Sequence, residues 1–150
     1  MVLPFEEEYR KKYYKLLDEV FESNFWSDGK MTRTFEEKFE EYTGLHSCAV
    51  TSGGAGLLSI FEYIGVKGYD VIVPANTFWA TTQSAKMAGA NIIYADCNKE
   101  DLCLSYEDVL KKVTKKTKAI VVVHIGGHIA FDIEKISAFC KEKNISLVED

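Results

Sequence analysis

The sequence lacks long hydrophobic runs, an excess of positive charge and clustered cysteines, and each absence argues against a class of protein. A membrane-spanning helix needs about 20 consecutive apolar residues, and no run in this chain approaches that length. The formal net charge of -5 argues against a nucleic-acid-binding surface. The N-terminal residues are acidic and aromatic, which does not fit a signal peptide. We therefore expect a cytoplasmic protein that binds neither nucleic acid nor membranes.

Metal ligands in a recognisable spacing are also missing. His124 and His128 are four residues apart, but they flank a predicted strand end and a glycine turn, which favours loop or structural histidines over a metal pair. The cysteines are scattered without metal spacing, and we expect all four to be buried free thiols in a reducing compartment. They are Cys48, Cys97, Cys103 and Cys140. No metal site is predicted.

The composition is that of a soluble globular protein. The chain has 150 residues, of which 47% are apolar and 27% charged, enough for one domain with a substantial core. Apolar residues recur at helical spacing over residues 4–23, and a polar connection follows over 24–33. Thr34 and Glu37 form a plausible capping box for a second helix, and Gly44 suits its C-terminal end.

After Gly44, short apolar segments alternate with helical patterns. The apolar segments predict strands at 47–50, 71–73, 91–94, 119–123 and 145–148. The helical patterns cover 54–64, 77–87, 105–113 and 132–143. Continuously apolar strands are typical of a parallel sheet that is buried on both faces. The predicted fold class is therefore α/β, a mainly parallel sheet with helices on both faces.

A glycine-rich stretch, residues 51–57, joins the first predicted strand to a helix. Such a turn lets backbone N–H groups approach an anion, although a tight turn without a ligand is the alternative. It is not a Walker A loop, because no Gly-Lys-Ser/Thr follows, and it lacks the third glycine of a dinucleotide fingerprint.

Three segments at strand carboxyl ends fit one cofactor, pyridoxal phosphate. Its phosphate would lie on the amides of Gly54 and Ala55, next to Gly53, and Phe78 would lie against the ring. The carboxylate of Asp150 would hold the protonated ring nitrogen. The alternatives are that Phe78 is a core or interface aromatic and that Asp150 is a cap or loop ligand.

The order of these motifs resembles the DegT/DnrJ/EryC1/StrS family of sugar aminotransferases. The resemblance covers nearly the whole chain and is carried by six segments in order. They are Phe35–Gly44, Ser52–Leu57, Pro74–Thr81, Gly89–Asp96, His124–Gly127 and Glu149-Asp150. Gly54 departs from the pattern, because the family usually has threonine there.

The resemblance implies a partial large domain of a fold-type-I pyridoxal-phosphate-dependent transferase. The implied reaction transfers an amino group, with glutamate as donor, to a keto group of a nucleotide-linked sugar in polysaccharide or secondary-metabolite biosynthesis. It also implies a homodimer in which each site borrows residues from its neighbour.

The resemblance places the Schiff-base lysine beyond Asp150, so we expect residues 1–150 to be the N-terminal part of the large domain and inactive alone. Within it, 1–33 would be a helix and connection, and 34–150 the α/β portion, with the small C-terminal domain absent. A partner chain that carries the C-terminal half is the alternative to a homodimer. The alternative functions are a sugar dehydratase, a non-catalytic half-site or assembly subunit, and a nucleotide-binding Rossmann-like domain.

Overall fold

The computed structural model describes residues 6–27 and 29–150 and divides the chain into two compact units, Met1–Ala49 and Val50–Asp150. The first unit holds two helices, α1 (Glu7–Ser23) and α2 (Lys30–Thr43). The predicted helix over 4–23 is therefore present from Glu7, and its expected start at Pro4 lies outside the described residues. No helix in the described part of the chain combines the length and the apolar character that crossing a membrane requires.

The start of α2 corrects one prediction. The helix begins at Lys30 after Gly29, so Thr34 lies inside it and does not cap it. The connection predicted over 24–33 therefore ends earlier, because lysine, methionine and arginine are good helix formers, and the Arg33 N–H donates to the carbonyl of Gly29 at 3.3 Å. Gly44 ends the helix in the left-handed conformation (φ 73°), as expected.

A second prediction is wrong at residues 47–50, which form no strand. The glutamates of α2 take up the hydrogen-bonding groups that a strand would use. The N–H groups of Ser47 and Ala49 donate to the side chains of Glu40 and Glu36 at 2.9 and 2.8 Å. The glycine-rich stretch therefore follows an irregular segment and not a strand.

The second unit is built on a four-stranded, fully parallel sheet with the order β2-β1-β3-β4. The strands lie close to their predicted positions, because their continuous apolar runs mark them clearly. They are β1 (Asp70–Pro74), β2 (Asn91–Ala95), β3 (Thr117–Val122) and β4 (Ser146–Glu149).

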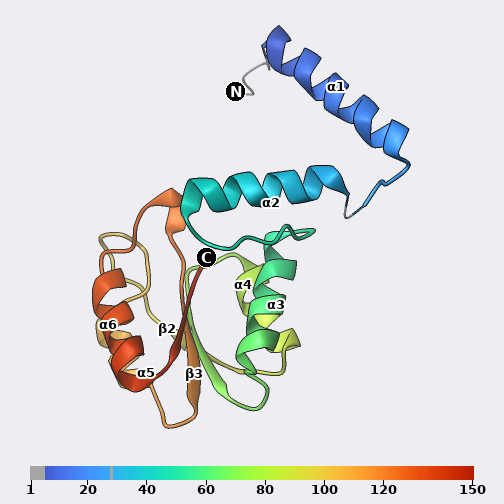
Figure 1. Ribbon diagram of the computed structural model, residues 1–150. Helices are drawn as coiled ribbons and strands as arrows, with labels where there is room; N and C mark the ends of the chain where they lie inside the picture. Colours follow the sequence, from blue (N-terminus) through green and yellow to red (C-terminus); the bar gives the residue numbers. More distant parts are fainter. Residues whose placement is uncertain (1–5, 28) are drawn as a thin grey trace. The chain divides into compact units, whose positions relative to one another are not determined.

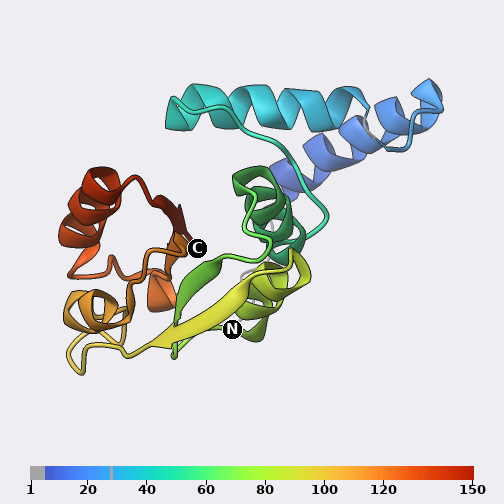
Figure 2. The same ribbon diagram turned by 90° about the horizontal axis from the view of Figure 1, so that it is seen from below.

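Helices cover both faces of this sheet, as predicted. Figures 1 and 2 show α3 and α4 on one side and α5 and α6 on the other. The bounds are α3 (Gly53–Ile64), α4 (Trp79–Met87), α5 (Tyr106–Lys112) and α6 (Ile133–Lys143), with a short 3-10 turn, η1, at Ile125–Gly127.

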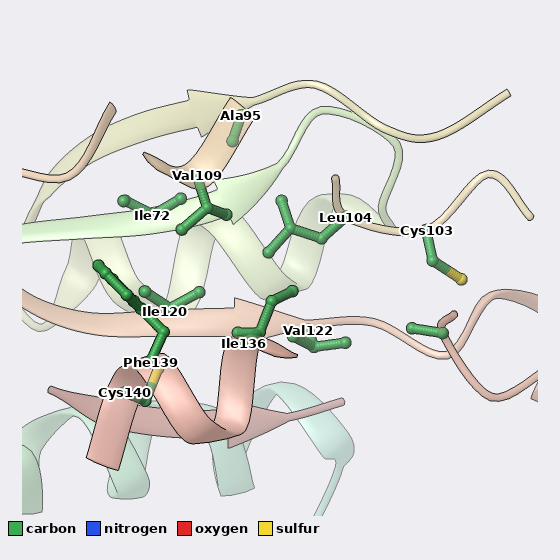
Figure 3. Packing of buried hydrophobic residues seen from close by; sticks show 11 residues of the cluster. Ile72, Ala95, Cys103, Leu104, Val109, Ile120, Val122, Ile136, Phe139 and Cys140 are labelled. Carbon is green, nitrogen blue, oxygen red and sulfur yellow. The ribbon is translucent and has the colours of Figure 1, made fainter. Parts of the chain in front are cut away.

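The core has two layers because successive strand residues point to opposite faces. Ile72 and Ile120 pack with Ile136 and Phe139 of α6 (Figure 3). On the other face Val71, Val73, Ala119 and Val121 pack with Leu57 and Phe61 of α3. The sheet is thus covered by a packed apolar layer on each face.

The cysteines are only partly as expected. Cys103 and Cys140 are buried free thiols, and burial raises the pKa of Cys140 to about 11. Cys48 is exposed and Cys97 is half-buried, so the expectation of four buried thiols is wrong for these two. Cys48 lies in the irregular segment that replaces the first predicted strand.

Candidate functional site

The glycine-rich stretch forms the N-terminus of α3. Ser52 caps the helix: its Oγ accepts the N–H of Ala55 at 3.1 Å, and its carbonyl accepts the N–H of Gly56 at 3.0 Å. The N–H groups of Gly53 and Gly54 lie in the first turn, where no helical carbonyl precedes them. They are therefore available to an anion, whereas an anion at Ala55 has to share or replace its bond to Ser52.

The two glycines face different surroundings. A Cβ at Gly53 would have no atom within 4 Å, whereas a Cβ at Gly54 would contact Ala80 at 3.6 Å and Ser84 Oγ at 3.7 Å. Ser84 is buried, and its Oγ donates to the carbonyl of Gly54 at 2.9 Å. The first turn of α3 is therefore fixed against α4.

Phe78 and Trp79 begin α4, with Phe78 at the N-cap position. Both rings are largely exposed, at 68% and 67%, and their centroids are 5.6 Å apart at an interplanar angle of 54°. Neither is a core residue, so two flat apolar surfaces are available at this edge of the sheet.

Asp150 follows β4 directly and is held through both its backbone and its side chain. Its N–H donates to the carbonyl of Val122 at 2.9 Å, and its carbonyl accepts the N–H of His124 at 3.0 Å. Its Oδ2 accepts a hydrogen bond from Thr81 Oγ1 at 2.6 Å, and Thr81 Oγ1 accepts one from Thr77 Oγ1 at 2.8 Å.

A cavity of about 340 Å³ brings these segments together. Its lining consists of Ser52, Gly53, Gly54, Leu57, Phe78, Trp79, Ala80, Thr81 and Asp150. Every cofactor-site residue predicted from the sequence lines it except Ala55, which lies one position further along α3. Figure 1 shows the C-terminal end of the chain at this edge of the sheet.

The cavity has the chemistry that pyridoxal phosphate needs. Free amides at a helix N-terminus suit a phosphate, the two aromatic rings suit a flat heterocycle, and a carboxylate suits a protonated ring nitrogen. The open space at Gly53 leaves room for the phosphate oxygens. The residues that are present therefore fit this cofactor.

His124 lies beside this site but is bonded within the protein. Its Nδ1 accepts the N–H of Ala130 at 3.1 Å, so Nε2 carries the proton and donates to Glu149 at 3.0 Å. His128 contacts the ring of Phe131 instead, with centroids 5.0 Å apart. Among the described residues, no group of three or more histidine, cysteine or acidic side chains is arranged to hold a metal ion.

Sequence reasoning missed three hydroxyl groups, that of Thr77 just before α4 and those of Thr81 and Ser84 within it. These residues follow one another at spacings of four and three, which would place them along one face if the helix began at Thr77 as predicted. Thr81 and Ser84 are buried with Ala85 on the face that packs inward. Hydroxyl residues at helical spacing on an otherwise buried face were the available signal.

Comparison with known proteins gives a consistent result. The model of the DegT/DnrJ/EryC1/StrS aminotransferase family matches residues 7–150. GDP-perosamine synthase of Vibrio cholerae is 35% identical over 139 residues, which cover 91% of this chain and 38% of that protein. The dTDP-4-dehydro-2,3,6-trideoxy-D-glucose 4-aminotransferase of Saccharopolyspora spinosa is 32% identical over 88% of this chain and 35% of that protein. The chain thus spans less than two-fifths of the length of these relatives.

Solved structures agree on the fold. The crystal structure of 3-amino-5-hydroxybenzoic acid synthase matches with a TM-score of 0.88 and 28% identity, over 100% of this chain and 39% of that chain. An E. coli GDP-4-keto-6-deoxy-D-mannose-3-dehydratase with bound hydrated PLP matches with a TM-score of 0.85, over 99% of this chain and 39% of that chain. Because the two sequences are only 23% identical, this match shows the fold alone. The expected fold, part of the fold-type-I large domain, is confirmed.

Proposed function

Because this chain belongs to the DegT/DnrJ/EryC1/StrS aminotransferase family, we propose that it supplies the cofactor-binding part of a pyridoxal-phosphate-dependent sugar aminotransferase. The substrate is a nucleotide-linked sugar with a keto group, and the amino donor is glutamate. Residues 1–150 form the N-terminal part of the large domain. The observation that carries the proposal is the cavity in which free amides, exposed aromatic rings and the carboxylate of Asp150 converge.

Different residues of the cavity bind different parts of the cofactor. The first-turn amides of α3, from Gly53 to Ala55, bind the phosphate, and α4 fixes that turn through Ser84. Phe78 covers one face of the ring and excludes water from it. Asp150 holds a proton at the ring nitrogen. When bound, pyridoxal phosphate supplies a ring that accepts electrons from a carbanion, and this requires the protonated nitrogen.

The site is completed by a second polypeptide surface in the proposed assembly, a homodimer. The described part of α1 exposes aromatic side chains at helical spacing, with Tyr9 and Tyr13 each 62% exposed. Exposed apolar surface of this kind favours association. Sedimentation velocity over a concentration series tests this assembly, and a mass that stays at 17.0 kDa contradicts it.

The test of the cofactor role is Asp150→Asn, which keeps the shape of the side chain and removes its charge. We expect the phosphate end to bind as before, while the ring nitrogen loses its proton and amino transfer slows strongly in the assembled enzyme. Binding is measured by titration with pyridoxamine 5'-phosphate, and turnover with a nucleotide-linked keto sugar and glutamate. Near-normal turnover of the variant refutes the role of Asp150.

The same assay separates the second candidate, sugar dehydration. It is the alternative that the family resemblance leaves open, and the E. coli dehydratase shares the fold of this chain. An aminated sugar as product supports the aminotransferase, whereas a deoxygenated sugar released without an amino group supports the dehydratase.

A further inference from the structure

The hydroxyl of Thr81 is buried beside the candidate site and bonded to it. Only 1% of Thr81 is exposed. Its single hydroxyl hydrogen goes to Asp150 Oδ2 at 2.6 Å, and its oxygen accepts the hydrogen of Thr77 Oγ1 at 2.8 Å. A hydrogen bond of this length to a carboxylate is in the range of charge-assisted bonds.

This partner is not the one that local structure offers. A threonine inside a helix commonly bonds to the carbonyl four residues earlier in its own helix. Thr81 instead reaches a carboxylate 69 residues further along the chain. The bond therefore links the first turn of α4 to the end of β4, across the cavity that both residues line.

The bond occupies one of the two carboxylate oxygens of Asp150. The backbone of Asp150 is fixed to the β3 end by two hydrogen bonds, and Thr81 holds Oδ2. Within residues 6–27 and 29–150, no hydrogen bond reaches Oδ1. With Oδ2 held by Thr81, Oδ1 has no hydrogen-bond partner among these residues and is the oxygen left to accept a bond from a ligand.

We propose that Thr81 is a positioning residue for the cofactor site, and that Thr77 orients Thr81 in turn. Through Asp150, the pair fixes the direction of the carboxylate toward the ring nitrogen of the bound cofactor. This inference rests on the proposed function, because it assumes that Asp150 meets the ring nitrogen.

The experiment uses the purified protein and pyridoxamine 5'-phosphate whose ring nitrogen carries the heavy isotope. This probe has no aldehyde, so its binding requires no lysine. Its nitrogen chemical shift, followed over a pH series, reports the pH at which the bound ring loses its proton. The dissociation constant comes from the same titrations.

Three variants separate positioning from packing. Thr81→Val keeps the shape and removes the hydroxyl; we expect affinity to fall about tenfold, the loss of one hydrogen bond to a charged group. The midpoint of ring deprotonation should fall by about one pH unit, the equivalent tenfold change. Thr81→Ser restores the hydroxyl and should restore both values. Thr82→Val is the matched control, since the Thr82 side chain makes no hydrogen bond to any described residue.

The outcomes distinguish this inference from the proposed function. If the wild-type protein does not bind the probe, or binds it with a neutral ring nitrogen, the proposed cofactor site is wrong and the inference falls with it. If the wild type binds a protonated ring and Thr81→Val leaves the midpoint unchanged, the positioning role alone is overturned. Should Thr81→Val fail to fold, Thr77→Val keeps the direct bond and still predicts a smaller shift in the same direction; no shift there overturns the proposal.

Discussion

Gly54 is the second residue of α3, and its role depends on its backbone N–H. We expect Gly54→Pro to weaken binding of pyridoxamine 5'-phosphate by roughly 1–3 kcal/mol, because it removes one donor to a charged phosphate. Proline is tolerated in a first helical turn, whose N–H groups have no helical acceptor. The measurement is a calorimetric titration, with a melting curve to show that the variant is folded.

Gly54→Ala is the matched control for this substitution. Its Cβ meets Ala80 at 3.6 Å and Ser84 Oγ at 3.7 Å, which are ordinary contact distances, and its N–H is kept. Alanine should therefore bind the probe nearly as well as glycine. Equal losses for alanine and proline would mean that crowding, and not the amide, determines binding.

Three residues that line the cavity could be named from the sequence. Gly54, Phe78 and Asp150 each follow an apolar run and carry a feature that a phosphate, a ring or a ring nitrogen needs. Thr81 and Ser84 could not be named in the same way, because their partners lie 69 and 30 residues away in the chain. Only the folded sheet brings those partners within hydrogen-bonding distance.

Among the elements, the junction between α5 and α6 depends on one buried carboxylate, Asp132. Its Oδ2 accepts hydrogen bonds from Asn98 Nδ2 and from the N–H of Tyr106, each at 3.1 Å, and Lys135 Nζ lies 2.7 Å from Oδ1. Burial alone would raise the pKa of Asp132, but the hydrogen bonds from Lys135, Tyr106 and Asn98 outweigh it and hold the pKa below its ordinary value of 3.8.

We therefore expect Asp132→Ala to lower the free energy of unfolding by about 1–3 kcal/mol near neutral pH, because the three donors lose their acceptor. A carboxylate whose pKa is lowered by folding stabilises the protein above its unfolded pKa, and this contribution is lost as the pH falls through the folded pKa. The difference in free energy of unfolding between the variant and the wild type should thus become smaller as the pH falls below about 4.

Urea unfolding at neutral and acid pH measures both effects. Glu134→Ala is the control, since Glu134 is an exposed acid in the first turn of the same helix. If the difference in free energy of unfolding between Asp132→Ala and the wild type stays constant into the acid range, the ionised carboxylate of Asp132 does not stabilise the fold.

The elements differ in how far the sequence determines them. The strands at 71–73 and 119–123 are continuously apolar and were predictable, because such runs are typical of strands buried on both faces. The segment at 47–50 is also largely apolar, but hydrogen bonds to Glu36 and Glu40 replace a ladder there. The glutamate side chains of α2 compete with a strand ladder for the N–H groups of this segment. The pattern of residues 47–50 alone does not reveal this competition, because the glutamates lie in an earlier helix.

In the sheet as a whole, the strands have the order β2-β1-β3-β4, and the side on which the chain adds strands changes between β1 and β3. From β1 the chain moves to one edge to form β2, and then returns to build β3 and β4 on the other side. Ligands of open α/β sheets bind at the carboxyl ends of strands beside such a reversal. The cavity is lined by residues that follow β1 and β4, so the topology and the side chains select the same edge of the sheet.

The same strand order predicts how the second unit opens. Strands β1 and β3 are bonded on both sides, and their residues Val71–Pro74 and Ala119–Val122 are buried, whereas β2 is an edge strand with a mixed pattern of burial. Amides in the best-covered part of a structure exchange only through its largest opening, so their exchange is the slowest. We expect the amides of β1 and β3 to exchange at least about tenfold more slowly than those of β2, a difference of about 1.4 kcal/mol in opening free energy.

Hydrogen exchange measured by mass spectrometry tests this prediction, with α1 as the internal fast reference because none of its residues is buried. Protection of β2 equal to that of β1 contradicts an exposed edge and means that another strand or a partner surface pairs with it.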